Sequence, residues 1–228
     1  MAFGITVWRA HTACVADWAG TFEREAARYR DGEARLEDGS DERQRQLTRM
    51  GNAAWGAALC LLMQGDDARE WLTRAAERWR ESYVDAPAGS WGRPIGAIKA
   101  LVLSDDWTGA AEASRWALEE GAGEAESAIG RYAAALACEV LGDWEHARVH
   151  ADAIRIRDDF PRDVGDALAM IAAEDVVGYV EAVESVLESF ETRDEYLEDV
   201  PVADTVLVLQ ALAGRRGMTA ELSSELLP

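Results

Sequence analysis

Apolar positions along this chain recur with the period of an α-helix from about residue 12 to residue 214. Ala, Leu, Glu and Arg, which favour helices, are abundant, and only five prolines interrupt the 228 residues. Sustained alternation between hairpin turns, the pattern of β-strands, is missing. The pattern predicts about ten helices, near residues 12–30, 40–64, 67–84, 91–103, 107–120, 123–141, 144–157, 162–173, 175–192 and 202–214.

The sequence also repeats one unit, in which an apolar helix, a tight acidic break and a second, amphipathic helix follow one another. Four such units span residues 57–79, 97–118, 133–153 and 167–187. Their breaks align at Asp67, Asp106, Asp143 and Asp175. The spacings of 39, 37 and 32 residues are typical of helical-pair repeats. We therefore expect one all-α domain over residues 1–228, with antiparallel helical pairs stacked in a tetratricopeptide-like right-handed array.

Each acidic break has a predicted structural role. The aspartate lies where the second helix begins, so its carboxylate is expected to accept hydrogen bonds from free backbone N–H groups. A tryptophan follows the aspartate in Asp17-Trp18, Asp106-Trp107 and Asp143-Trp144. We expect these rings to pack back onto the preceding helix, with recognition as the alternative role. Glycines are predicted to end helices at Gly65, Gly121, Gly142 and Gly217.

The composition predicts a folded, cytoplasmic protein. Hydrophobic residues make up 49% of the chain, enough for a sizeable core. The longest apolar run, residues 57–63, is far shorter than the roughly 20 residues that span a bilayer. The first 18 residues lack the pattern of a signal peptide. Three cysteines fit neither a disulfide framework nor a zinc finger and are interpreted as small buried hydrophobes: Cys14, Cys60 and Cys138.

The net charge of −20 disfavours nucleic acid and anionic membranes as partners, because both need a basic face. Two interpretations remain: a surface that engages a basic partner, or adaptation to a saline cytoplasm. Lys99 is the sole lysine beside 22 arginines, and we take this avoidance of lysine to favour salt adaptation. At molar salt the Debye length falls to about 3 Å, so dense like charges repel one another little.

The sequence contains no pattern typical of catalysis. A nucleophile elbow, a phosphate-binding loop and a dinucleotide fingerprint are all missing, so we expect neither an enzyme nor a cofactor. His146 and His150 are four residues apart on a predicted helix, a spacing that can hold a metal. Their context, WEHARVH, differs from the HExxH motif of zinc peptidases. An exposed pair without metal is the favoured interpretation, and metal binding stays the alternative.

The best candidate for a binding site is the loop over residues 89–94, which carries Trp91 and Arg93 between glycines. Tryptophan and arginine are the types most enriched among interface hot spots. The alternative is structural: Trp91 fills the core and Arg93 caps a helix end.

Further candidates lie within predicted helices. Lys99 and Arg131 are cations in otherwise apolar helices and are expected to face the same surface, and Trp55 and Asn52 are weaker candidates. Stacked helical pairs create extended concave surfaces for such residues.

Residues 173–228 resemble the C-terminal part of an all-helical immunity-protein family from bacterial polymorphic toxin systems. The resemblance rests on an acidic turn, an aromatic, paired leucine-like positions, a glycine and a Leu-Pro end, here Asp175, Tyr179, Val183, Leu187, Leu209, Leu212, Gly217, Leu226, Leu227 and Pro228. It implies a protein that neutralises a toxin by tight association, and it assigns no active residue.

We therefore predict a non-enzymatic protein-binding module, a monomer or homodimer with a protein or peptide partner. It is either an immunity protein that neutralises a toxin or a scaffold. Two alternatives are kept. One is a helical protein that binds a small molecule or metal through His146 and His150, and the other is a self-associating structural protein.

Overall fold

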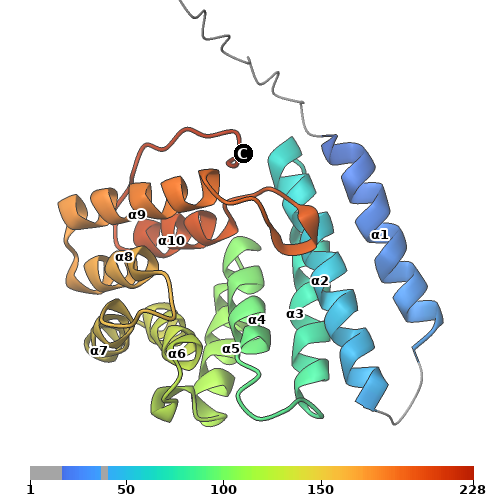
Figure 1. Ribbon diagram of the computed structural model, residues 1–228, viewed down its shortest axis with the longest axis horizontal. Coiled ribbons are helices and arrows are strands. Elements are labelled where there is room, and N and C mark those ends of the chain that lie inside the picture. Colours follow the sequence, from blue (N-terminus) through green and yellow to red (C-terminus); the bar gives the residue numbers. More distant parts are fainter. Residues whose placement is uncertain (1–16, 37–40) are drawn as a thin grey trace, which may run out of the picture.

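A computed structural model describes residues 17–36 and 41–228 of the chain. These residues form ten α-helices and two short 310-helices and contain no strand (Figure 1). The α-helices are α1 (Trp18–Ala34), α2 (Asp41–Gln64), α3 (Arg69–Tyr83), α4 (Gly92–Leu103), α5 (Trp107–Glu119), α6 (Ala128–Leu141), α7 (Trp144–Arg155), α8 (Arg162–Ala173), α9 (Val176–Glu191) and α10 (Asp204–Arg215). The prediction of an all-helical chain of about ten helices is confirmed.

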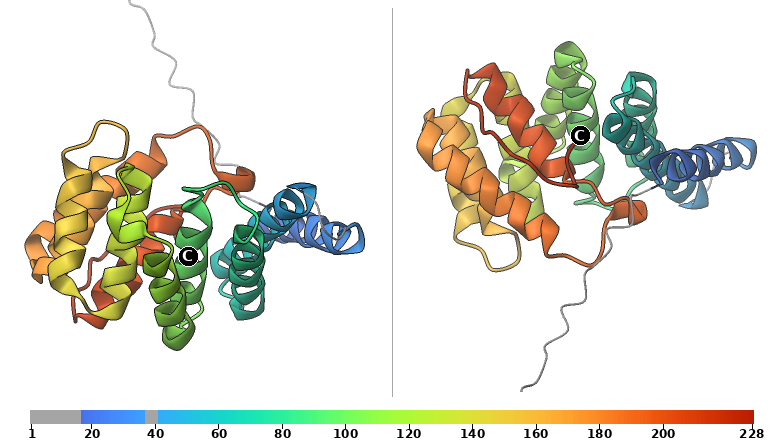
Figure 2. Two further views of the ribbon diagram at one scale, coloured as in Figure 1. Left: turned by 90° about the horizontal axis from the view of Figure 1, so that it is seen from below. Right: turned by 90° about the horizontal axis from the view of Figure 1, so that it is seen from above.

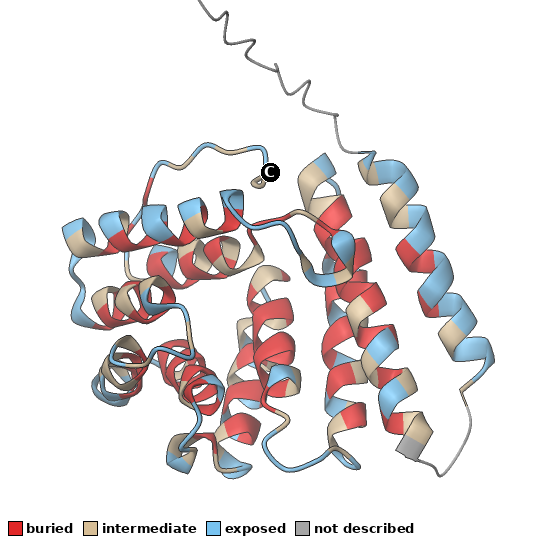
Figure 3. Cartoon of the chain, in the orientation of Figure 1, coloured by how far each residue is buried: buried red, intermediate tan, exposed pale blue. Residues whose placement is uncertain are grey.

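Consecutive helices from α1 to α9 pack against one another as antiparallel neighbours (Figure 1). The first helices of successive pairs also touch, since α6 contacts both α4 and α8. They form one surface of the stack, which we call the inner face. Burial follows this arrangement, since α4 and α6 are buried along most of their length whereas α1 and α9 expose one side (Figure 3). The prediction of stacked helical pairs is confirmed.

Aspartate caps begin several of the helices, as the sequence predicts. Asp106 and Asp175 accept a hydrogen bond from the N–H three residues later at 2.9 and 3.0 Å, and Asp143 does so at 3.4 Å. At α3 the prediction is correct only in part. The Asp67 carboxylate accepts a hydrogen bond from the N–H of Arg69, the first residue of the helix, at 3.0 Å and also pairs with the Arg69 guanidinium, but Ala68 occupies the cap position.

The predicted helix-end glycines all adopt left-handed backbone angles, which a residue with a Cβ rarely tolerates. Their φ values lie between +69° and +92° at Gly65, Gly121, Gly142 and Gly217. Two helices differ from their predicted bounds. The first, predicted near residues 12–30, covers Trp18–Ala34 with Asp17 as its cap, and residues 12–16 lie outside the described residues. The sixth helix begins at Ala128 and not near residue 123, because Ala122–Glu124 forms a 310-helix and Ser127 provides the cap.

The last helix, α10, lies across the inner face of the stack (Figure 2). It packs against α4, α8 and α9, and Arg215 at its end donates a hydrogen bond to the Val140 carbonyl in α6 at 3.1 Å. The chain after α10 folds back along it, because the N–H of Ala203 donates to the Leu226 carbonyl at 2.9 Å. Part of the inner face is therefore covered by the chain itself.

The tryptophans of two Asp-Trp pairs are held between helices. Trp144 lies against Gly142 at the end of α6, and Trp107 is partly buried against the core. Two arginines at the end of α10 stack on these rings, with Arg215 4.3 Å from the Trp107 centroid and Arg216 4.1 Å from that of Trp144. Both tryptophans therefore have a structural role in fixing α10 to the stack.

Cys60 and Cys138 are free thiols in the core, as predicted, and Cys14 lies outside the described residues. Burial raises the pKa of both thiols to about 11, so they stay protonated near neutral pH. Among the helices of residues 17–36 and 41–228, none has both the length and the apolar character needed to cross a membrane.

Candidate functional site

A pocket of about 410 Å³ opens between α2, α3, α4, α6 and the start of α10. We call it the tryptophan pocket. It contains four of the five residues that the sequence singled out for binding, Trp55, Trp91, Arg93 and Lys99. The remaining lining residues are Thr48, Asn52, Trp79, Gly89, Ser90, Gly92, Ile95, Gly96, Ile129, Leu197 and Asp204. The loop at residues 89–94 and the middle of α4 thus contribute to one site.

Three buried tryptophans form the floor of the pocket. The ring centroids of Trp55 and Trp79 are 5.8 Å apart, and the Trp79 indole N–H donates to the Asn52 side-chain oxygen at 3.0 Å. Two glycines make room for Trp79, because a Cβ at Gly51 or Gly96 would lie 2.7 Å from its ring. The position of this ring therefore depends on glycine in both α2 and α4.

Replacing Gly96 with alanine is expected to lower the free energy of unfolding by about 1–3 kcal/mol, since the added methyl overpacks the Trp79 ring. Urea unfolding followed by circular dichroism measures the effect. Gly92→Ala is the matched control, because the same methyl at the start of α4 meets nothing within 4 Å. Equal unfolding midpoints for the two variants would show that the ring moves aside freely.

Arg93 joins α4 to α2 and α3 through neutral acceptors. Its Nε donates to Ser82 Oγ at 2.9 Å, and one Nη donates to Gln44 Oε1 and Thr48 Oγ1 at 2.5 and 3.1 Å. Burial lowers the pKa of the guanidinium from its usual value. The structure thus places Arg93 as a link between helices and not as a helix cap.

Lys99 is buried in α4 and pairs with α10. Its Nζ lies 2.6 Å from Asp204 Oδ2, donates to Thr205 Oγ1 at 3.2 Å and sits 5.6 Å from the Trp55 ring centroid. The pair fixes the first turn of α10 as one wall of the pocket. Trp91 is buried too, as the structural alternative predicts, while part of its surface still lines the pocket.

The rim of the pocket is apolar and accessible. Ile129 in α6 is 40% exposed, and Leu197 in the 310-helix Leu197–Asp199 is 51% exposed. That 310-helix is held against α1 and α2, because Asn52 in α2 donates to Glu198 at 3.2 Å and Arg28 in α1 pairs with the same carboxylate. Such a combination of a buried aromatic floor and an exposed apolar rim is typical of a site for a partner's side chain.

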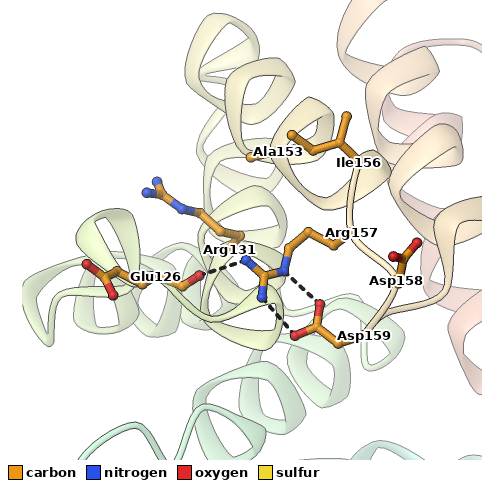
Figure 4. A pocket seen from close by; sticks show the side chains of 7 residues that line it. All are labelled: Glu126, Arg131, Ala153, Ile156, Arg157, Asp158 and Asp159. Carbon is orange, nitrogen blue, oxygen red and sulfur yellow. Dashed lines mark hydrogen bonds and ion pairs between the residues drawn. The ribbon is translucent and has the colours of Figure 1, made fainter.

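Arg131 lies elsewhere, so the expectation that it shares a surface with Lys99 is wrong. Positions 129 and 131 are about 200° apart around a helix, and Ile129 is the one that faces the tryptophan pocket. Arg131 lines a separate hollow with Arg157 and Asp159 (Figure 4). Its Nη1 donates to the Gly123 carbonyl at 2.8 Å, and in the figure its guanidinium points away from Arg157.

His146 and His150 bind separate partners. The exposed His146 ring lies 2.8 Å from Asp143, which raises the pKa of the imidazole. His150 is buried, its Nδ1 lies 3.3 Å from Arg131, and burial lowers its pKa. The prediction that both histidines are exposed is therefore correct for His146 and wrong for His150. Within the described parts of the chain, no three His, Cys, Asp or Glu side chains are grouped to hold a metal.

Sequence reasoning missed three parts of the pocket: Trp79, Asp204 and the rim. For Trp79 a signal exists, since glycines occur mid-helix at positions 51 and 96, where helix propensity disfavours them. Asp204 and Leu197 carry no local signal, because they reach the pocket only through the return of the chain across the inner face.

The residues that carry the immunity-protein resemblance have structural roles. Asp175 caps α9, Tyr179 is buried and donates to Gln210 at 2.7 Å, and Gly217 ends α10 with a φ of +69°. The leucine-like positions lie in the core: Val183, Leu187, Leu209 and Leu212. Comparison with protein-family models, curated proteins and solved structures finds no match for this chain.

Proposed function

We propose that this protein is a non-enzymatic protein-binding module and that a side chain of its partner sits in the tryptophan pocket. The observation that carries the proposal is the 410 Å³ pocket itself, which joins a buried tryptophan floor to the exposed Ile129 and Leu197. Binding energy in protein interfaces concentrates where large apolar side chains enter such hollows. Arg93 and Lys99 add polar groups that orient the occupant.

The position of α10 supports this choice of surface. A peptide that binds along the inner face would have to displace α10, whose Val206, Val208, Leu209 and Leu212 are buried in the core. The tryptophan pocket lies at the start of α10, where the inner face is open. A partner therefore reaches the pocket without any rearrangement of the stack.

A photoreactive benzoylphenylalanine at position 129 is expected to crosslink the partner in lysate of the source organism, with the adduct identified by mass spectrometry. Position 149 on the outer side of α7 is the matched control, since Val149 is also exposed, at 57%, and is not among the pocket's lining residues. Crosslinks from 149 and none from 129 would place the interface on the outer surface and contradict the proposal.

The resemblance to immunity proteins gives the first partner class to test, a protein toxin. The matching residues cap helices and fill the core, so the resemblance does not identify the surface that would contact a toxin. The tryptophan pocket is the surface that we propose. Purified toxin candidates in the same crosslinking assay extend the test to this narrower role.

A further inference from the structure

Arg93 is a cation whose hydrogen bonds are incomplete. A guanidinium has five N–H donors, and those of Arg93 that have partners bind Ser82, Gln44 and Thr48, which are neutral. No carboxylate pairs with Arg93 among the described residues, and its Nη1 has no protein acceptor there. The arginine that lines the pocket therefore has a positive charge and donors left for a ligand.

The charged residues that line the pocket have a net charge of +1. Arg93, Lys99 and Asp204 are its charged lining residues, and the 2.6 Å pair of Lys99 with Asp204 neutralises two of them. The chain as a whole carries −20, so this site has the opposite sign to its surroundings. At physiological ionic strength the Debye length is about 8 Å, and the distant surface acids are largely screened. A carboxylate is the complementary ligand group, because the free Nη1 of Arg93 can donate a charge-assisted hydrogen bond to it.

The unpaired cation beside apolar walls favours the end of a chain as the occupant. An internal peptide segment offers an apolar side chain and a carboxylate on different residues. A C-terminal residue carries its carboxylate and its side chain on the same Cα, so one residue satisfies both Arg93 and the apolar walls.

We propose that the tryptophan pocket binds the C-terminal residue of a partner protein, with the free carboxylate on Arg93 and a large apolar side chain against the tryptophans. This inference rests on the proposed function and names the part of the partner that is recognised. Capture of a terminal carboxylate is an established mode of peptide recognition.

Calorimetry with three short peptides tests the inference. The first ends in phenylalanine with a free carboxylate, the second is the same peptide as its C-terminal amide, and the third is an amide with internal phenylalanine followed by aspartate. We expect the free acid to bind the wild-type chain at least about ten-fold more tightly than either amide, as the loss of a charged hydrogen bond implies.

Variants assign the effect to the pocket. Arg93→Gln is expected to bring the ratio of acid to amide affinity to about one, while Ile129→Ser weakens both peptides and keeps the ratio. Arg115→Gln on the exposed side of α5 is the control and leaves both affinities unchanged. Circular dichroism verifies folding, and Arg93→Lys, which keeps the charge but removes the free Nη1, gives a smaller ratio if Arg93→Gln fails to fold.

Equal affinity for acid and amide, tighter binding of the aspartate peptide, or no binding by any peptide would overturn the inference. The proposed function has a separate readout, the crosslinks at position 129. Partner crosslinks at position 129 together with equal binding of acid and amide would support the protein-binding pocket. They would also show that the pocket does not recognise the C-terminal carboxylate.

Discussion

Replacing Glu139 with glutamine is expected to stabilise the protein by about 5 kcal/mol at pH 9 and to have little effect at pH 5. Glu139 lies in α6 with only 2% of its surface exposed, and neither carboxylate oxygen has a hydrogen-bond partner among the described residues. Burial raises the pKa of this carboxyl to about 8, and the nearby charge of Arg216 lowers it only in part. Urea unfolding at a series of pH values measures the difference.

The direction follows from proton binding. Between pH 4.5 and 8 the folded chain keeps the proton on Glu139 while the unfolded chain releases it. The stability that this group contributes is therefore fully present below pH 4.5 and is lost as the pH rises towards 8, by about 1.4 kcal/mol for each unit. Glutamine removes this dependence because it has no proton to lose.

Glu184→Gln on the exposed side of α9 is the matched control and is expected to leave the pH profile unchanged. The informative quantity is the difference between Glu139→Gln and wild type across the pH series. A constant difference from pH 5 to pH 9 would mean that Glu139 is ionised throughout. The nearby Arg216, which donates to the Ile171 and Ala172 carbonyls at 2.7 Å, would then be stabilising the charge.

The fold was largely predictable because its signals are local. Helical periodicity, capping aspartates such as Asp106 and helix-end glycines such as Gly142 each act within one or two turns of the chain. Asp67 shows the limit of this reasoning, since an arginine two residues later takes its carboxylate. The path of α10 across the inner face was not predictable, because it depends on contacts with helices more than 60 residues away in sequence, such as the hydrogen bond of Arg215 to Val140.

The candidate site was predictable in part for the same reason. Trp91 and Arg93 stand out because two large polar or aromatic residues occur in a glycine-framed loop, and Lys99 because a cation is rare in an apolar helix. That these residues share one pocket follows from the packing of α2, α4 and α10, which composition does not encode. Arg131 has the same local signal as Lys99 but faces another side of the stack.

Replacing Asp204 with asparagine is expected to destabilise the protein by about 3 kcal/mol, because it leaves the charge of Lys99 buried without a counter-ion. Lys99→Met is expected to cost less. The charge that it leaves is at the first residue of α10, where the positive helix end stabilises a carboxylate. Urea unfolding of both single variants and the double variant gives a coupling energy, with exposed Asp194→Asn as the control.

The double variant distinguishes two ways in which Lys99 and Asp204 could contribute to stability. If Lys99→Met with Asp204→Asn recovers most of the stability lost in Asp204→Asn, the cost came from an unpaired charge, as expected for a buried ion pair. Additive losses would instead mean that each side chain acts through separate contacts, such as that of Lys99 with the Trp55 ring at 5.6 Å. Because the pair also holds the first turn of α10 at the pocket, a stable double variant with weaker peptide binding would show that it positions a wall of the tryptophan pocket in addition to stabilising the fold.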